Sequence, residues 1–339
     1  MAKRTLLGRL GESVLIVFCI VTLNFFLIRF MPGDPVLHII GEEEYYNLEV
    51  HAPQVIEEIR GEYGLNQSLG RQYLTYLGKT ARLDFGNSYR TKAPVLETVL
   101  FRMKWTLFLA IPATVIAAFL GGALGLWAGW KPGGRFDLAA TPCFLLISTV
   151  PTNCLAILFL ICFAFQLGWF PISGITSGGL TGFAKGLDIL HHMALPLAVL
   201  VLYKTSSNYM LMKSTVSLIR QEDYVSTAIS KGLSQGKVLS RHVLKNALCP
   251  YLTSICMQFG GMLAGSMMTE IVFSWKGMGT LIYDAVNAKD FPMLQTCFLL
   301  ISICVVAFNL IADLLCLAVD PRVREGMNHV CLLYTSRCV

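Results

Sequence analysis

Long apolar runs are the feature that most limits how this chain can fold. Six stretches are long enough to cross about 30 Å of hydrocarbon at about 1.5 Å per helical residue. They cover residues 13–30, 105–130, 138–165, 193–212, 250–273 and 292–319. The sequence therefore predicts an all-α, polytopic membrane protein with six transmembrane helices in the lipid bilayer.

Composition excludes several other classes of protein. Hydrophobic residues make up 55% of the chain and charged residues only 14%, so water cannot be its only solvent. The net charge of +6 does not indicate nucleic acid, because the basic residues fall mostly between apolar runs and form no face interleaved with aromatics. Eleven cysteines occur without a CxxC pair, and no HExxH pattern is present, so no metal site is predicted.

The positive charges predict the orientation of the chain. Basic residues are frequent in 1–12, 131–137, 213–249 and the C-terminal region, whereas the short loops on the other side hold only Lys185, Lys276 and Lys289. Because cytoplasmic loops are enriched in Lys and Arg, both termini are predicted to be cytoplasmic.

This orientation divides the chain into parts. The predicted parts are a cytoplasmic N-terminus and first helix (1–30), an external segment (31–104), a five-helix domain (105–325) with a cytoplasmic loop (213–249), and a tail (326–339). Apolar residues at helical spacing near 54–63 and 71–80 predict two short amphipathic helices, so the external segment is expected to be folded.

The cytoplasmic loop holds the most informative pattern. A helix starting near Glu222 would place acids at its positive end. Val225, Ala228, Ile229 and Leu233 would then form one narrow apolar stripe. The segment is too short and too charged to span a membrane, so the stripe favours a groove on a partner protein. A solvated loop with incidental periodicity is the alternative.

Charged residues at membrane depth are a second candidate site. Lys204, Glu270 and Asp313 lie inside apolar runs, and Asn208 follows Lys204 by one helical turn. Such charges are costly unless they are paired or face water. Counting from the cytoplasmic ends places Lys204 about 13 Å deep and Asp313 about 9 Å deep. An ion pair between these two residues is predicted over contact with an anionic cargo.

Two further patterns concern packing and catalysis. Gly121, Gly125 and Gly129 recur at every fourth residue, which predicts close approach of another helix. The nearest match to a phosphate loop, 232–238, is one residue short and lacks the Ser or Thr that binds magnesium. No nucleophile with an adjacent base is evident. The sequence therefore predicts a protein that is not an enzyme and holds no cofactor.

Several motifs in fixed order resemble a known family. The segment 222–250 is similar to the cytoplasmic loop of binding-protein-dependent ABC transporter permeases of the dipeptide, oligopeptide and nickel family. Other matching motifs are FMPGDP (30–35), GLNQSL (64–69), LDFGNSY (83–89), LGWFPISG (167–174), EIVFSWKGMG (270–279) and DPRVRE (320–325). Together they cover residues 1 to about 325.

The resemblance implies a coupling helix that inserts into an ATP-binding subunit. The residues it would place there are Glu222, Asp223, Tyr224, Val225, Ala228, Ile229, Gly232 and Leu233. The chain departs from the family pattern at two points. Ser226-Thr227-Ala228 stands where the broad motif has Glu-Ala-Ala, and Lys276 stands where the family usually has proline.

The resemblance also implies partners and a location. These are two ATP-binding subunits or one dual ATPase, a second homologous permease, and an external solute-binding protein that docks on 31–104, all at the bacterial cytoplasmic (inner) membrane. The implied cargo is a peptide or a related small solute such as nickel, a metal chelate or glutathione.

A secondary, ion-coupled transporter is the main alternative, with Lys204 and Asp313 relaying protons. That alternative gives no reason for the apolar stripe in the cytoplasmic loop. The last nine residues, 331–339, read CLLYTSRCV, which matches one reading frame of a common transposase-based sequencing adapter. We expect these nine residues to be absent from the natural protein.

Overall fold

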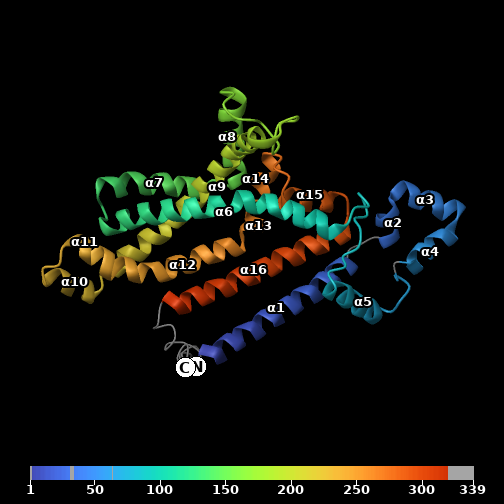
Figure 1. Cartoon of the computed structure of the whole chain (residues 1–339), viewed down its shortest axis with the longest axis horizontal. Coiled ribbons are helices and arrows are strands. Elements are labelled where there is room, and N and C mark those ends of the chain that lie inside the picture. The colour runs from blue at the N-terminus through green and yellow to red at the C-terminus, as the bar shows by residue number, and fades with distance from the viewer. Residues whose placement is uncertain (1, 31–33, 63, 320–339) are drawn as a thin grey trace. The chain divides into compact units, whose positions relative to one another are not determined.

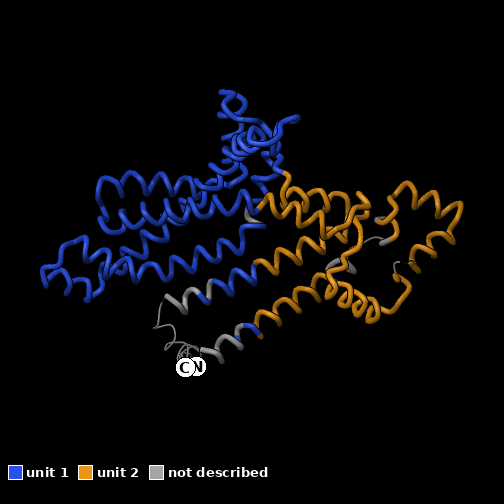
Figure 2. Tube along the Cα trace, in the orientation of Figure 1, with its two compact units in different colours: residues 1–10, 107–275, 305–339 blue, residues 11–106, 276–304 orange. Residues whose placement is uncertain are grey.

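A computed structural model describes residues 2–30, 34–62 and 64–319. Within them the regular structure is helical, apart from one isolated β-bridge between Asn87 and Pro94 (Figure 1). The expected C-terminal tail, with the expected artefact at 331–339, lies outside the described residues. The chain divides into two compact units (Figure 2): unit 1 comprises 1–10, 107–275 and 305–339, and unit 2 comprises 11–106 and 276–304.

Each unit contains its own set of helices. Those of unit 2 are α2 (Pro35–Ile40), α3 (Glu42–His51), α4 (Pro53–Glu62), α5 (Leu69–Ala81) and α15 (Met278–Asn287). Those of unit 1 are α7 (Arg135–Thr149), α8 (Thr152–Phe159), the π-helical η1 (Leu160–Gln166), α9 (Gly182–Ile219), α10 (Asp223–Ser230), α11 (Gln235–Val238), the π-helical η2 (Leu239–Leu244), α12 (Lys245–Gly260), α13 (Met262–Gly265) and α14 (Met267–Val272). The remaining helices each contain a boundary between the units: α1 (Ala2–Arg29), α6 (Val95–Trp130) and α16 (Phe291–Val319).

The membrane-spanning character of the fold is carried by a few long helices. Among the described residues, α6, α9 and residues 291–311 of α16 are long and apolar enough to cross a bilayer. The bent pair of α7 with α8 and η1 brings the number to four if it counts as one span. The apolar part of α1, Leu10–Phe26, is shorter. The prediction of an all-α membrane protein is confirmed, and the total of six spans stays a prediction.

The predicted third span is not one continuous helix. Its two halves are bent by 102° at a break between Thr149 and Thr152. Val150 has extended backbone angles, φ −80° and ψ 126°, because Pro151 disfavours helical angles in the residue before it. The expectation of an unbroken helix over 138–165 is therefore wrong.

The predicted fifth span is also divided. In place of one helix over 250–273, the chain forms α12, α13 and α14, with breaks at Gly261 and Ser266. Glycine has a low helix propensity because its backbone loses the most conformational freedom on folding. The break at Gly261 follows from this local weakness.

Unit 2 confirms both amphipathic helices predicted for 31–104, since α4 and α5 match 54–63 and 71–80 within two residues. The sequence prediction missed α2 and α3. Asp34 joins these helices: its side chain accepts hydrogen bonds from the backbone N–H of Val36 (2.9 Å) and from the hydroxyl of Tyr45 (2.9 Å), and it pairs with Arg60. Burial alone would raise the pKa of Asp34, but these hydrogen bonds outweigh burial and hold that pKa below its usual range.

Close packing between α6 and α9 explains the glycine repeat. A Cβ atom on Gly121 would lie 2.9 Å from the carbonyl oxygen of Thr205, and one on Gly125 would lie 2.6 Å from that of Tyr209. The same holds at Gly129, one turn further on, against the carbonyl of Lys213 at 2.6 Å. The predicted helix contact is confirmed, and α9 lies directly on the backbone of α6 over three turns.

Candidate functional site

The cytoplasmic loop predicted from the sequence forms a short helix where it was expected. The helix α10 begins after Glu222, which occupies the N-cap position, and Asp223 lies in its first turn. Acids at that end are stabilised by the helix dipole. The helix ends before Gly232, whose φ of +78° is in the left-handed region that favours glycine after a helix. Within unit 1, α10 contacts α11, which contacts η2 (Figure 1).

Part of the predicted stripe faces the chain's own core. Val225 has an exposed fraction of 0% and Ala228 of 5%. Both belong to a cluster that we call the anchor cluster. Its buried members are Trp130, Met212, Val216, Val225, Ala228, Val238, Val243, Ala247 and Tyr251. The prediction that Val225 and Ala228 share one partner-facing stripe with Ile229 and Leu233 is therefore wrong, because the first two fix α10 to the rest of unit 1.

The other side of α10 remains uncovered. Tyr224, Ile229 and Leu233 are exposed, with Ile229 at 49%. At 100° per residue, Tyr224 and Ile229 flank the buried stripe, and the exposed Ser226 and Ser230 lie opposite it. The hydroxyl of Tyr224 accepts a hydrogen bond from Nδ2 of Asn246 at 2.9 Å, which fixes the direction of the ring. We call these five residues the exposed face of α10.

A charged network beside the anchor cluster was missed by the sequence prediction. Nζ of Lys213, on α9, lies 2.5 Å from Oδ1 of Asp137, on α7, and donates to the hydroxyl of Thr141 at 2.8 Å. Asp137 also accepts from Thr141 (2.7 Å) and from the backbone N–H of Gly133 (2.9 Å), and the hydroxyls of Thr141 and Tyr209 lie 2.9 Å apart. The sequence offers one indication of this pair, since Asp137 and Lys213 lie at the ends of two neighbouring apolar runs.

The middle of α9 holds a different polar group. Nζ of Lys204, which is partly buried, donates to the hydroxyl of Thr114 on α6 at 3.1 Å. One turn further along α9, the fully buried Asn208 accepts a hydrogen bond at Oδ1 from Nε2 of Gln258, on α12, at 2.6 Å. Two buried atoms of this amide pair, Nδ2 of Asn208 and Oε1 of Gln258, have no hydrogen-bond partner in the described structure. We call Thr114, Lys204, Asn208 and Gln258 the polar seam.

The other two intramembrane charges are placed differently. Glu270 is fully buried in α14, where Ser266 donates a hydrogen bond to Oε1 at 3.0 Å. Asp313 belongs to α16, but its side chain lies outside the described part of the chain. The predicted pairing of Asp313 with Lys204 therefore stays a prediction.

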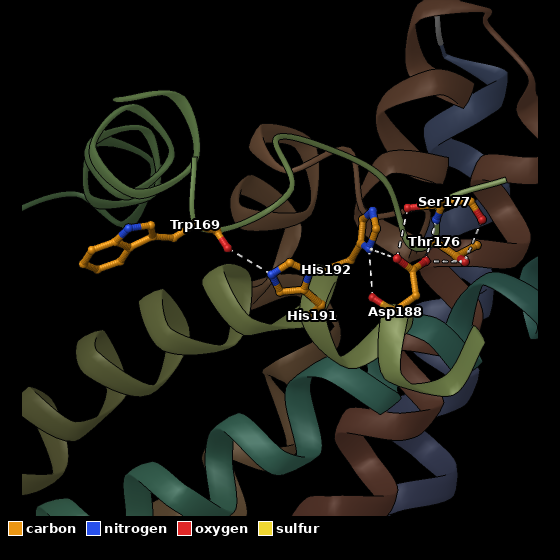
Figure 3. A network of polar contacts seen from close by, with 6 residues as sticks. All are labelled: Trp169, Thr176, Ser177, Asp188, His191 and His192. Atoms are coloured by element: carbon orange, nitrogen blue, oxygen red, sulfur yellow. Dashed lines mark hydrogen bonds and ion pairs between the residues drawn. The ribbon is translucent and has the colours of Figure 1, made fainter. Parts of the chain in front are cut away.

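A third polar network ties a loop to the start of α9 (Figure 3). Asp188 accepts hydrogen bonds from the hydroxyl of Thr176 (2.7 Å) and from the backbone N–H of Ser177 (2.6 Å). The ring of His192 lies against the same residue, with Nδ1 2.8 Å from the Asp188 carbonyl, and Nε2 of His191 lies 3.0 Å from the carbonyl of Trp169. The adjacent histidines therefore contact different partners, one on the loop and one on α9 itself.

Comparison with known proteins assigns the family. Residues 121–325 match the model of the binding-protein-dependent transport system inner membrane component, and residues 2–110 match the N-terminal model of the same kind of membrane component. The two matches take in the anchor cluster, the exposed face of α10 and, apart from Thr114, the polar seam. This chain therefore belongs to the family of binding-protein-dependent transport system inner membrane components.

Named relatives agree with this assignment over nearly the whole chain. The dipeptide transport system permease protein DppB of Alkalihalophilus pseudofirmus is 33% identical over 327 residues, which cover 92% of this chain and 96% of the relative. The di/tripeptide transport system permease protein DppB of Pseudomonas aeruginosa is 33% identical over 94% of this chain and 97% of its own length. The dipeptide transport system permease protein DppB of Escherichia coli is 31% identical over 94% and 98%. The family resemblance seen in the motifs is confirmed.

Proposed function

We propose that this chain is the permease subunit of an ATP-driven importer for peptides, and that it forms the translocation pathway together with a second homologous permease. The relatives named for peptide transport match 92% to 94% of this chain, which favours peptides over nickel, metal chelates or glutathione as cargo. ATP would be hydrolysed on two separate ATP-binding subunits, or on one dual ATPase. The permease itself would need no cofactor.

The proposed topology follows from the distribution of charge. Six spans would place both termini in the cytoplasm of a bacterium and the segment 31–104 outside, where a solute-binding protein would dock. The long helices α6, α9 and α16 and the bent pair of α7 and α8 would supply part of the spans. The divided fifth segment, α12 to α14, would supply another span.

The observation that carries the proposal is the construction of α10. One side of this helix is fixed in the anchor cluster, and Tyr224 and Ile229, which flank that side, are uncovered in a segment too short and charged to span a membrane. A helix held in this way transmits a push from a partner directly to α9, because Met212 and Val216 of α9 pack in the same cluster. The exposed face of α10 would therefore be the contact with the ATPase.

Substitution of the exposed face tests this contact. Ile229→Glu would bury an unpaired charge in the interface, at a cost of about 3 kcal/mol or more. We expect normal levels in the membrane, weak recovery of the ATPase with the purified permease, and loss of peptide uptake. Ser240→Glu, an equally exposed change on η2 of the same cytoplasmic segment, is the matched control and should leave all three quantities unchanged.

Ala228→Glu does not serve this purpose, since Ala228 is part of the anchor cluster and its substitution would damage the permease itself. Normal ATPase recovery together with normal uptake in Ile229→Glu would show that α10 is not the element that couples the permease to the ATPase. The experiment requires co-expression of the permease pair, the ATPase and the binding protein.

A further inference from the structure

The polar seam has hydrogen-bonding capacity that the described chain leaves unused. An ammonium group has three N–H donors, and Thr114 takes up one of those of Lys204 through a neutral hydroxyl. Lys204 has no ion pair with any carboxylate in the described part of the chain. A cation inside an apolar run is costly without a counter-charge, and such residues mark substrate pathways in transport proteins.

The amide pair of Asn208 and Gln258, beside Lys204, also has unpartnered hydrogen-bonding atoms. The hydrogen bond from Gln258 to Asn208 uses one donor and one acceptor, and it leaves the NH2 group of Asn208 and the carbonyl oxygen of Gln258 without a partner in the described structure. Each unpartnered buried polar atom costs free energy that the fold does not recover. One free donor and one free acceptor are what a peptide group, with its own N–H and C=O, would satisfy.

The spacing of these groups fits the end of a peptide. Lys204 and Asn208 are four residues apart on α9, which corresponds to about 6 Å along the helix axis. An extended peptide advances about 3.5 Å per residue, so a terminal carboxylate at Lys204 places a preceding peptide group within reach of the amide pair.

We propose that Lys204, with the Asn208–Gln258 amide pair, is a subsite that binds the C-terminal carboxylate and the adjoining peptide group of a peptide in transit. This inference rests on the proposed function as a peptide importer. Lys204 is the first contact because it is partly exposed, whereas the free amide atoms are buried in the present conformation. The peptide therefore reaches the amide pair when α9 and α12 separate during the transport cycle.

The test compares two peptides that differ only at the C-terminus. The complete transporter is reconstituted in proteoliposomes with ATP inside, and uptake of alanyl-alanine and of its C-terminal amide is measured. Each peptide is supplied at a concentration that saturates the binding protein, so that receptor preference does not set the ratio. In the natural chain, uptake of the free acid is expected to exceed uptake of the amide.

Removal of the charge should abolish this discrimination. We expect Lys204→Met to reduce uptake of the free acid by roughly tenfold or more and to leave uptake of the amide nearly unchanged, since a hydrogen bond to a charged group is worth at least one factor of ten in affinity. Lys204→Arg should retain the preference. Gln258→Leu should weaken uptake of both peptides. Lys185→Met, which removes an exposed lysine from the start of the same helix, should change neither rate.

Other outcomes separate the possible failures. An unchanged ratio of acid to amide in Lys204→Met, or an equal loss of both, would overturn the subsite. If Lys204→Met fails to accumulate and Asp313→Leu restores it, Lys204 is one half of a structural ion pair and the subsite is wrong. If Lys204→Met fails to accumulate and Asp313→Leu does not restore it, the test rests on Lys204→Arg. Loss of the preference for the free acid in Lys204→Arg, with that variant at its normal level in the membrane, would overturn the proposal. Absence of any peptide uptake by the natural chain would instead count against the proposed function.

Discussion

Two lysines on α9 show how differently one helix can hold a positive charge. Lys213 lies 2.5 Å from the carboxylate of Asp137 and also donates to Thr141, beside the anchor cluster. Lys204, nine residues earlier, donates only to the neutral hydroxyl of Thr114 in the described structure, next to an amide pair with two unpartnered atoms. Within the described residues, the first lysine has a carboxylate partner and the second has none.

The two lysines therefore separate a part of α9 that stabilises the fold from a part that has groups available for binding. A matched ion pair with its hydrogen bonds satisfied fixes α7 against α9 at the end that carries α10. An ammonium group without a counter-charge and an amide pair with unpartnered atoms both lower the stability of the folded protein. Such groups are therefore expected where they bind a ligand. We therefore expect substitutions near Lys213 to affect mainly folding, and substitutions at Lys204 to affect mainly transport.

Both lysines lie on α9, which packs on the backbone of α6, so Gly125→Val is expected to have the largest effect of the substitutions compared. The new Cβ would lie 2.6 Å from the carbonyl oxygen of Tyr209, which lies between the two lysines. Overpacking of this kind costs on the order of 1–3 kcal/mol or more. We expect a strong fall in membrane level, measured with a fluorescent fusion, and a lower melting temperature in detergent.

The matched control for this substitution is Gly186→Val, since no atom lies within 4 Å of the position of a new Cβ there. Both glycines belong to long apolar helices, so the pair isolates packing from helix propensity. A normal melting temperature for Gly125→Val would mean that α6 and α9 do not pack as described.

A smaller effect is expected from Lys213→Met. Removal of Lys213 leaves the carboxylate of Asp137, which is nine-tenths buried, without its counter-charge. We expect this to lower the free energy of unfolding by up to about 3 kcal/mol, the low end for a buried pair, because Lys213 is partly exposed. The melting temperature in detergent should fall, and the double variant Lys213→Met with Asp137→Leu should recover most of the loss. Lys204→Met should change the melting temperature much less. Equal falls in melting temperature for Lys213→Met and Lys204→Met would contradict the distinction drawn between the two lysines.

Local sequence patterns predicted several parts of this fold. The start of α10 could be predicted because its acids and its apolar spacing are contained within a few residues. The helices α4 and α5 could likewise be predicted from their local apolar spacing. The glycine repeat on α6 predicted a close helix contact, although only the structure identifies α9 as the partner. The break at Val150 could have been read from Pro151, since a residue before proline avoids helical angles.

Other parts depend on residues that are far apart in the chain. Periodicity placed Val225 and Ala228 on one stripe, but it could not show that Trp130 and Met212 already cover that stripe. The pairing of Lys213 with Asp137 joins two helices, so neither residue indicates the other. The unpartnered atoms of Asn208 and Gln258 are likewise a property of the packed helices and have no local signature.

We propose that ATP, rather than an ion gradient, drives transport through this permease. The direct measurement is uptake of a labelled dipeptide into proteoliposomes that hold the permease pair and the ATPase, with binding protein outside. We predict uptake that requires ATP inside and is lost in Ile229→Glu, while a proton gradient without ATP drives none. Uptake driven by the proton gradient in the absence of ATP, and unchanged in Ile229→Glu, would contradict the account and favour a secondary transporter.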